Sequence, residues 1–477
     1  MLMTTLMNKT MKLMMAAAVC ALATAADAVG TRGRYFTDDA GKAWIPVGCN
    51  ICTVNAPFDG PVDHAAVRAQ MDEWLRAFAE NGGDYVRLWL GCRAFEIMPE
   101  KPGVYDPEVE KTLTGIVRLC EELGVKLKFT IESFRMCLPK EKAVTGYQKC
   151  FNRHLYAPYV KTMKEFYESD FCRRTYLGKV ERLKALGFAD SPAVVCWELW
   201  NEINATAPLA DYTAWSDYML ARFRRMFPKQ LVVQNLGSFS DAGAYQQYDQ
   251  IGEMPVNDFM QVHRYLDMGA PIDACRAPMD VIAATAVREM LARRADKPAV
   301  LAETGAVIAN HRGPSPYYPL DRDGALLHDA LFAPFFAGGA GCGHFWHWDC
   351  YIAKNNLWYH FARFKRAIAG LDPIAEEFRP FYTETHHLRV YGLKGKKTTV
   401  IWCRDKQSDW RWEFVESKGP ALLKGEKLPF YDREAECYLP WEDKVVKTTL
   451  PVLPDFWRSI VVKFPTPKDY EPFQEAH

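Results

Sequence analysis

Apolar residues along the first 370 positions follow two alternating spacings. Between Val67 and Phe78, four apolar residues recur at steps of four, three and four, which is the spacing of one helix face. An Asn-Gly-Gly sequence at residues 81–83 ends that helix, and the run DYVRLWL at residues 84–90 is typical of a buried strand. The same alternation of strand and helix then repeats along the chain.

The repeat predicts eight strand–helix units. We expect strands at residues 45–50, 84–90, 126–131, 194–202, 230–236, 258–265, 299–305 and 338–348, with a helical stretch after each. Eight such units are the count of a (β/α)8 TIM barrel. A doubly wound open sheet usually carries a glycine-rich phosphate loop after its first strand, whereas this strand ends in GCNICT. The sequence therefore predicts an α/β chain built around a (β/α)8 barrel.

The pattern changes near residue 370. Residues 371–380 have the composition of a linker, and the short runs HLRVYGL, TTVIWC, WRWEF and WRSIVVKF follow it, separated by Gly, Asp and Lys. Such short strands predict a small C-terminal β-sandwich domain. We divide the chain into residues 1–28, a catalytic domain at 29–380 and the β-sandwich at 381–477.

The first 28 residues resemble a secretory signal peptide. Lys9 and Lys12 precede an apolar run at residues 13–26, and Ala26-Asp27-Ala28 is a small-x-small cleavage signal. We expect cleavage after Ala28, and a secreted or periplasmic protein. The apolar run is short for a membrane span, so no membrane association is expected after cleavage.

Composition narrows the function. Lys and Arg total 59 and so do Asp and Glu, so no basic surface indicates a nucleic-acid partner. Of the 14 cysteines, Cys137 and Cys150 bracket a long loop and are one plausible disulfide. Cys49-x-x-Cys52 lacks a second CxxC or a His pair, so we predict no metal and no cofactor. The oligomeric state stays open.

Polar and aromatic residues gather at the predicted strand ends. The carboxyl ends of barrel strands form the active-site face. The residues placed there are Asn50, Arg87, Trp89, Asn201, Glu202, His263, Tyr265, Glu303, Trp346, Trp348 and Asp349. Two strand-end glutamates predict a carboxylate pair, which is what glycoside hydrolysis uses.

Three of these strand ends carry a family resemblance. VVCWELWNE, QVHRY and VLAETG are similar to the fourth-, sixth- and seventh-strand signatures of clan A glycoside hydrolases, especially the cellulase-like family 5, and VRLW resembles its second strand. The resemblance covers roughly residues 45–370. It implies a secreted enzyme whose partner is a β-linked oligosaccharide or polysaccharide.

The resemblance also implies a role for each residue. Glu202 corresponds to the acid/base and Glu303 to the nucleophile, with Tyr265 and Arg87 holding Glu303. The remaining implied contacts are Asn201 with the sugar 2-hydroxyl, His263 with the acid/base side, and Trp348 under the reacting sugar. Trp89 and Trp346 are candidates for either the core or a subsite, and Asn50 is a weaker match because the first strand departs from the family pattern.

The expected chemistry is double displacement. A retaining hydrolase needs carboxyl groups about 5–5.5 Å apart, one attacking the anomeric carbon and one protonating the leaving oxygen. Glu202 must keep its proton, so we expect an apolar setting that Trp197 and Trp200 help to build. Glu303 must stay ionised beside Arg87 and Tyr265.

Alternatives remain open at this level. The chain could be an endo-acting mannanase or cellulase, with the loops at residues 135–152 and 308–320 shaping the cleft. It could be a carbohydrate-binding protein without catalysis, or a metal-dependent hydrolase, which a chelator would inactivate. Single residues also have structural explanations. Glu202 or Glu303 could belong to a buried ion pair with an arginine, and Arg87 could simply stabilise the barrel. His263 could be a core histidine whose hydrogen bonds are satisfied.

Overall fold

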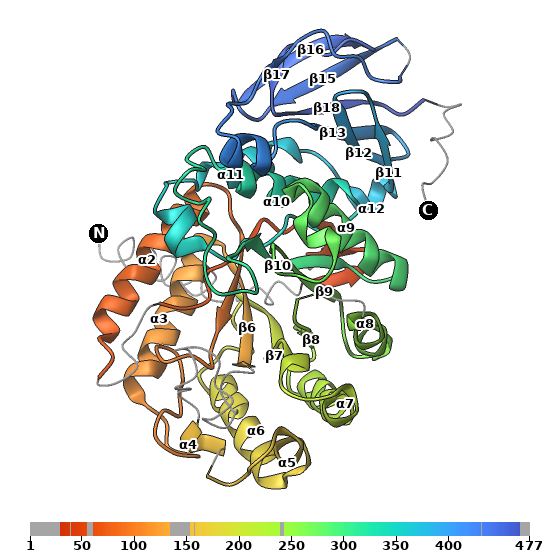
Figure 1. Ribbon diagram of the computed structural model, residues 1–477. Helices are drawn as coiled ribbons and strands as arrows, with labels where there is room; N and C mark the ends of the chain where they lie inside the picture. The colour runs from red at the N-terminus through yellow and green to blue at the C-terminus, as the bar shows by residue number, and fades with distance from the viewer. Residues whose placement is uncertain are drawn as a thin grey trace, which may run out of the picture.

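The computed structural model describes residues 29–467 apart from 39, 55–60, 134–152, 157, 239–242 and 431. A barrel of parallel strands surrounded by helices carries a second, antiparallel β domain against one side (Figure 1). The predicted signal peptide, the Cys137–Cys150 pair and the loop at 135–152 lie outside the described residues. These predictions therefore stay predictions.

Parallel strands form the barrel wall. The order is β4 (Gly48–Asn50), β5 (Tyr85–Trp89), β6 (Lys126–Ser133), β7 (Val194–Asn201) and β8 (Leu231–Val233), and β9 (Met260–Leu266) pairs with β10 (Ala299–Ala306). Single parallel bridges close the ring, from Ser238 to His263 and from Phe345 to both Cys49 and Thr304. The predicted (β/α)8 fold is therefore confirmed.

The eighth strand is shorter than predicted. Within residues 338–348 only Phe345 makes strand-like bridges, so an extended strand over that range is wrong. The glycines that suggested a strand serve close packing instead. A Cβ on Gly343 would lie 2.4 Å from the carbonyl oxygen of Ala330 in the helix behind it, so the backbone passes against that helix without a side chain between them.

Helices cover the outside of the barrel. They are α2 (His64–Glu80), α3 (Pro107–Leu123), α4 (Arg153–Tyr156), α5 (Met163–Glu168), α6 (Asp170–Ala185), α7 (Leu209–Met226), α8 (Ala244–Glu253), α9 (Met279–Arg293), α10 (Ala325–Phe336) and α11 (Tyr359–Ala367). The apolar stripe from Val67 to Phe78 is buried, as predicted. α5 and α6 are separated at Ser169, whose hydroxyl accepts from the Cys172 amide and starts α6.

A small sheet covers the amino-terminal end of the barrel. It consists of β1 (Gly30–Arg32), β2 (Tyr35–Thr37) and β3 (Ala43–Trp44). Phe36 packs edge-on against Phe259 and Trp44 against Tyr85, with ring centroids 5.1 and 5.4 Å apart. This end of the barrel is therefore filled with aromatic side chains, and the opposite end carries the polar strand termini.

The C-terminal domain is a six-stranded antiparallel sheet with a smaller second layer. The order is β11 (Arg379–Glu384), β12 (Leu388–Lys394), β13 (Thr398–Asp405), β18 (Ser459–Pro465), β15 (Arg433–Leu439) and β16 (Lys444–Leu450). A two-stranded sheet, β14 (Leu422–Leu423) with β17 (Phe456–Trp457), packs over one face. β11 begins at Arg379, so the predicted boundary at 380/381 falls within this strand.

Alternation along β13 explains how one sheet faces two cores. Val400 and Trp402 belong to the main core shared with the barrel, whereas Ile401 and Cys403 belong to the separate core of the C-terminal domain. Successive side chains of a strand point to opposite faces, so an unbroken apolar run serves both. The run TTVIWC is therefore a strand buried on both sides.

One predicted strand of this domain is wrong. Residues Arg411–Val415, which overlap the run WRWEF, form a π-helical turn. The Asp409 carboxylate accepts from the backbone amides of Arg411 and Trp412 and starts the turn. Trp410 and Phe414 then stack on Tyr317 from the barrel. Local capping and tertiary stacking outweigh the β propensity of the aromatic residues.

Two buried ion pairs join the domains. Arg404 on β13 binds Asp329 on α10 with an Nε–Oδ1 distance of 2.6 Å, and Arg389 on β12 binds Asp280 on α9. The side chains of Arg404 and Asp329 are almost fully buried. The C-terminal sheet is therefore docked on the barrel through a desolvated surface.

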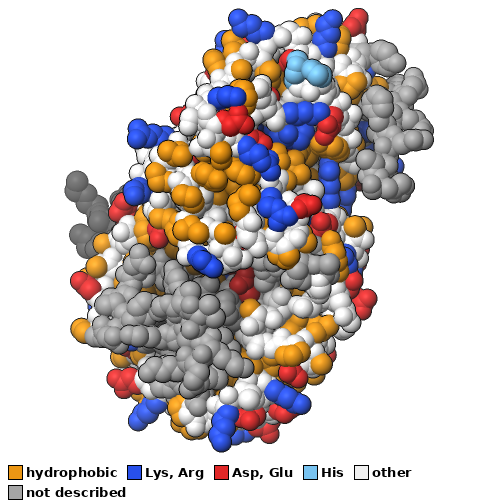
Figure 2. Space-filling model, in the orientation of Figure 1, with side chains coloured by type: hydrophobic (Ala, Val, Ile, Leu, Met, Phe, Trp, Pro, Cys, Tyr) orange, Lys and Arg blue, Asp and Glu red, His pale blue; other side chains and the backbone are white. Residues whose placement is uncertain are grey.

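Three further findings concern the cysteines, the helices and the surface. The eleven cysteines within the described residues are all free thiols, and no described helix has the length and hydropathy needed to cross a membrane. On the face shown in Figure 2, acidic and basic side chains are intermixed.

Candidate active site

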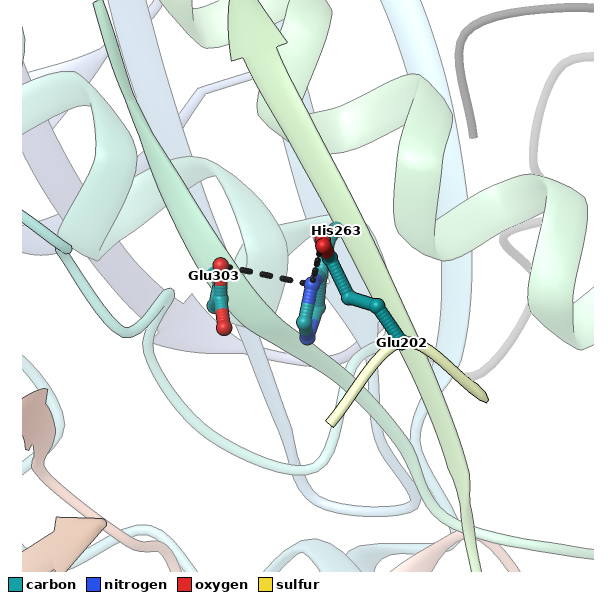
Figure 3. A group of neighbouring side chains, drawn as sticks. All are labelled: Glu202, His263 and Glu303. Atoms are coloured by element: carbon teal, nitrogen blue, oxygen red, sulfur yellow. Dashed lines mark hydrogen bonds and ion pairs between the residues drawn. The ribbon is translucent and has the colours of Figure 1, made fainter. Parts of the chain in front are cut away.

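Three side chains from three strands meet at the carboxyl end of the barrel. Glu202 directly follows β7, His263 lies on β9 and Glu303 lies on β10, and all three point toward one another (Figure 3). His263 Nδ1 is 2.9 Å from Glu202 Oε1 and 3.3 Å from Glu303 Oε2. One ligand atom from each residue fits within 4.8 Å of the others. The glutamates that lie a hundred positions apart in sequence thus form one pair.

Glu202 occupies a strained backbone position. Its φ and ψ are 53° and 52°, in the left-handed region that non-glycine residues rarely adopt. The Asn235 side chain accepts a hydrogen bond of 3.0 Å from the Glu202 amide, and the Asn235 carbonyl accepts from Ile203. Such a conformation costs about 1–3 kcal/mol and persists where the surroundings enforce it, typically at functional sites.

Asn235 also orients His263. Its side-chain nitrogen lies 2.9 Å from His263 Nε2. Because an amide nitrogen only donates, Nε2 is the acceptor, which places the ring proton on Nδ1. His263 therefore donates from Nδ1 toward the two carboxylates. One asparagine fixes both the acid/base backbone and the imidazole beside it.

Glu303 is aimed by a bulge and held by two donors. The pairing of β10 with β9 shifts between Leu301 and Glu303, and such a bulge redirects the next side chain. Arg87 Nη1 donates to Oε1, and the Tyr265 hydroxyl donates to Oε2 at 2.7 Å. The side chain is only 5% exposed. Both oxygens of this carboxylate are therefore engaged by donors.

Arg87 is shared among the polar groups of the site. Besides Glu303, its guanidinium donates to Glu198 and, at 2.7 Å, to the Asn201 side-chain oxygen. Burial lowers the pKa of Arg87, but the charges of Glu198 and Glu303 outweigh burial and raise it above the usual value. Arg87 is thus a permanent cation directly beneath the glutamate pair.

Aromatic side chains line one side of the site. Trp89 lies 4.9 Å from Trp346 between ring centroids, and Trp346 packs edge-on against Trp348. Trp348 is 4% exposed and packs against Trp74 of α2, whereas Trp346 keeps part of its surface exposed. An aromatic platform for a sugar must present a ring face, so Trp346 fits that requirement better than Trp348.

Two tryptophans expected near the acid point elsewhere. Trp197 stacks on Phe227 and Trp200 packs against Trp215, both on the helical side of the barrel wall. The expectation that they build the setting of Glu202 is therefore wrong. Both rings pack on residues in or next to α7, so closeness in sequence to Glu202 does not place them beside its carboxyl group.

The separation of the carboxyl groups decides what the site can do. Oxygens of Glu202 and Glu303 lie within 4.8 Å. Retaining glycosidases place the two groups about 5–5.5 Å apart, whereas inverting enzymes leave about 6.5–9.5 Å for a water molecule. The site therefore has the geometry of double displacement.

Two proteins of known name match part of the sequence. No family model matches the sequence. A protein of Oryza sativa subsp. japonica that carries the name mannan endo-1,4-beta-mannosidase 9 is 24% identical over 285 residues, 55% of this chain and 68% of the relative. Mannan endo-1,4-beta-mannosidase 3 of Arabidopsis thaliana is 23% identical over 211 residues, 39% of this chain. The second match spans half the length of that relative.

Solved structures share the fold. An endo-beta-1,4-mannanase from Thermotoga petrophila aligns over 86% of this chain and 98% of its own, with 16% identity and a TM-score of 0.50. A structure described as a glycoside hydrolase covers 93% of this chain and 97% of its own, with 11% identity and a TM-score of 0.58. The chain therefore shares its fold with these two solved structures, and the two sequence relatives both carry the name mannan endo-1,4-beta-mannosidase.

Asn50 lies on β4, next to Arg87. It is fully buried, and its amide nitrogen donates to the carbonyls of Ala302 and His344 at 3.0 and 2.9 Å. These bonds tie the first strand to the strands that close the barrel. The side chain is engaged with the protein backbone, which places it in barrel closure.

Sequence reasoning missed several residues of the candidate site. Asn235 follows β8, and the strand-end rule that found Asn201 would have found it too. Glu198 and Lys128 lie inside β7 and β6, fully buried. A charged residue within an apolar strand is itself a signal, because burying a charge demands a partner.

Glu202, His263 and Glu303 could in principle also hold a cation. Among the described residues, Glu202, His263 and Glu303 form the group with suitable ligand spacing. Arg87 and Tyr265 already engage both oxygens of Glu303, and a buried guanidinium repels a metal ion. The donor set therefore suits proton transfer better than metal binding.

Proposed function

We propose that this chain is an exported, retaining β-mannoside hydrolase in which Glu303 is the nucleophile and Glu202 the acid/base. The separation of the two carboxyl groups, with oxygens within 4.8 Å, carries the proposal. The names of the two sequence relatives support mannose as the sugar. Export rests on the residues that precede Val29.

In the first step Glu303 attacks the anomeric carbon. The bond to the leaving oxygen breaks as the new C–O bond to Glu303 forms, and Glu202 gives its proton to the departing oxygen. A glycosyl ester on Glu303 and an ionised Glu202 result. Tyr265 and Arg87 hold Glu303 in the orientation needed for attack.

In the second step Glu202 acts as the base. It takes a proton from water, the water oxygen attacks the anomeric carbon, and the ester bond to Glu303 breaks. The sugar leaves with its original β configuration, and both glutamates return to their starting protonation states. His263 donates from Nδ1 toward both carboxylates. Its hydrogen bond can therefore stabilise whichever of the two glutamates carries the negative charge.

Sugar contacts follow from the remaining groups. Asn201 is held through its oxygen by Arg87, so its NH2 group is oriented for the sugar 2-hydroxyl. Trp346 offers the exposed ring for stacking under the reacting sugar, with Trp348 and Trp89 packed behind it. We assign Asn50 to barrel closure.

The loop after β10 is relevant to whether the enzyme cleaves internal bonds (endo action) or bonds at chain ends (exo action). His311 packs edge-on against Tyr265, and its Nδ1 lies 3.1 Å from Asp267. Asn310 and His311 both have positive φ, and the Asn310 amide donates to the same Asp267 carboxylate. A loop fixed so close to the nucleophile's partner restricts one end of the cleft, which favours short β-mannosides over internal cleavage.

A panel of aryl β-glycosides tests the function. We expect turnover of the β-mannoside above the glucoside, galactoside and xyloside. Glu303→Ala and Glu202→Ala should each remove nearly all activity, and azide should partly rescue Glu303→Ala with an α-configured glycosyl azide. Activity near that of the wild type in either variant would refute the assignment, and preference for another sugar would refute mannose.

A further inference from the structure

A layer of buried charge lies directly beneath the active site. Lys128 on β6 lies 3.0 Å from the Glu198 carboxylate on β7, and Gln261 on β9 donates to the same carboxylate at 3.0 Å. The Thr130 hydroxyl donates to the other Glu198 oxygen at 2.9 Å. Lys128 and Glu198 are completely buried, and neither contacts solvent or takes a direct part in the chemistry.

Glu198 determines how Arg87 is oriented. Arg87 Nε and Nη2 both donate to Glu198 Oε1, which leaves Nη1 directed at Glu303. Glu198 therefore holds one edge of the Arg87 guanidinium like a clamp, and the nitrogen at the other edge donates to the proposed nucleophile, Glu303. Without the hydrogen bonds to Glu198, the planar guanidinium of Arg87 could rotate between the Glu303 carboxylate and Asn201.

Lys128 balances the charge that the clamp introduces. Arg87 and Glu303 alone would form a neutral pair, and Glu198 adds one negative charge. The ammonium of Lys128 cancels it, so two cations and two anions share the buried layer. Arg87 and Lys128 outweigh the effect of burial and lower the pKa of Glu198 to about 2, while burial lowers the pKa of Lys128.

The other titratable groups around Glu303 do not supply this balance. Those facing it are Glu202 from β7, His263 and Tyr265 from β9, Cys52 after β4 and Tyr248 from α8. Burial raises the pKa of Tyr265, Tyr248 and Cys52, so these three are neutral in the working range. Among them only Glu202 gives up and regains a proton in the proposed mechanism.

We propose that Glu198 and Lys128 are positioning residues, which fix Arg87 and set the charge balance that keeps Glu303 ionised. This inference rests on the proposed function of Glu303. Buried ion pairs add little stability compared with apolar packing. Their effect here is instead on the protonation of the nucleophile, which the acid side of the pH profile of kcat/KM reports.

The test changes the charge one group at a time. Lys128→Met removes a positive charge, so Glu303 should take a proton at higher pH and the acid limb of kcat/KM should move up by about one pH unit. Glu198→Gln removes a negative charge while keeping shape, so the acid limb should move down by a similar amount. The double variant Lys128→Met with Glu198→Gln should return the limb close to the wild-type position.

Thr130→Val is the matched control. It disturbs the same layer and the same Glu198 oxygen without changing any charge, so kcat should fall while the acid limb stays in place. A purely structural role would lower kcat in all variants with no signed shift. Unmoved limbs in Lys128→Met and Glu198→Gln would overturn the inference, and so would shifts of the same sign.

Failure of the inference is distinguishable from failure of the proposed function. If Glu303→Ala is inactive but the acid limbs of Lys128→Met and Glu198→Gln do not move, only the proposed role of Glu198 and Lys128 is refuted. If Glu303→Ala keeps its activity, the assignment of the nucleophile falls first. Each single variant carries its own signed prediction, so one that does not fold leaves the other to decide.

Discussion

Asn235 gives a sharp test of how the acid/base is held. Its side chain accepts from the Glu202 amide at 3.0 Å and contacts His263 Nε2 at 2.9 Å. Asn235→Ala removes both hydrogen bonds and leaves two buried groups unpaired. Each unpaired group costs about 1–3 kcal/mol, so we expect the free energy of unfolding to fall by about 2–6 kcal/mol.

Activity should fall for a separate reason. Glu202 loses the contact that enforces its left-handed backbone, and a displacement of about 1 Å can cost about 100-fold in rate. A β-mannoside with a poor leaving group needs the proton from Glu202, whereas a dinitrophenyl β-mannoside does not. We therefore expect kcat/KM to drop about 100-fold on the first substrate and only a few-fold on the second.

Asn257→Ala is the matched control. Asn257 is also buried, accepts from the Gln234 amide at 2.9 Å and donates to the Phe259 carbonyl at 3.1 Å, with no contact to the glutamates. It should lose similar stability by chemical denaturation but keep its ratio of rates on the two substrates. An equal loss on both substrates for Asn235→Ala would refute the reasoning.

Three further predictions concern the nucleophile, the domain contact and pH. Tyr265→Phe removes a donor to Glu303 and should lower kcat/KM by about 10–100-fold while the melting temperature changes little, because a hydrogen bond to a charged group is worth about 1.5–3 kcal/mol; an unchanged rate would contradict this. Arg404→Met should cost about 3–5 kcal/mol of unfolding free energy by leaving Asp329 unpaired, and Arg404→Met with Asp329→Leu should recover most of it; equal losses would argue against the buried pair. Burial lowers the pKa of His360 to about 3, so its contribution is complete above about pH 6.5 and is lost as the pH falls. The stability gap between wild type and His360→Gln should therefore narrow by about 2 kcal/mol between pH 6.5 and 5 in denaturation curves, and a constant gap would contradict it.

The barrel was predictable because its helices and strands differ in period. The stripe from Val67 to Phe78 follows directly from apolar spacing, and the structure places it on α2 as expected. The eighth strand was not predictable in its extent. Its glycines allow the backbone to lie close to α10. This is a tertiary contact that cannot be predicted from the local sequence.

The candidate site was predictable as far as strand ends identify it. Glu202, His263 and Glu303 were found because each polar residue follows or ends an apolar run. Glu198 was missed because it lies inside the strand, where its partners come from β5, β6 and β9. Trp197 shows the opposite error, because it was wrongly included in the site. Its proximity in sequence to Glu202 does not place it on the same face of the strand, and its ring stacks on Phe227 instead.

Trapping the covalent intermediate tests the central claim most directly. A 2-fluoro β-mannoside with a good leaving group should label the enzyme once, and peptide mass spectrometry should place the sugar on Glu303. The first product of ordinary turnover should then be the β-anomer by NMR. An active enzyme that releases the α-anomer, or that carries the label on a residue other than Glu303, would contradict the account.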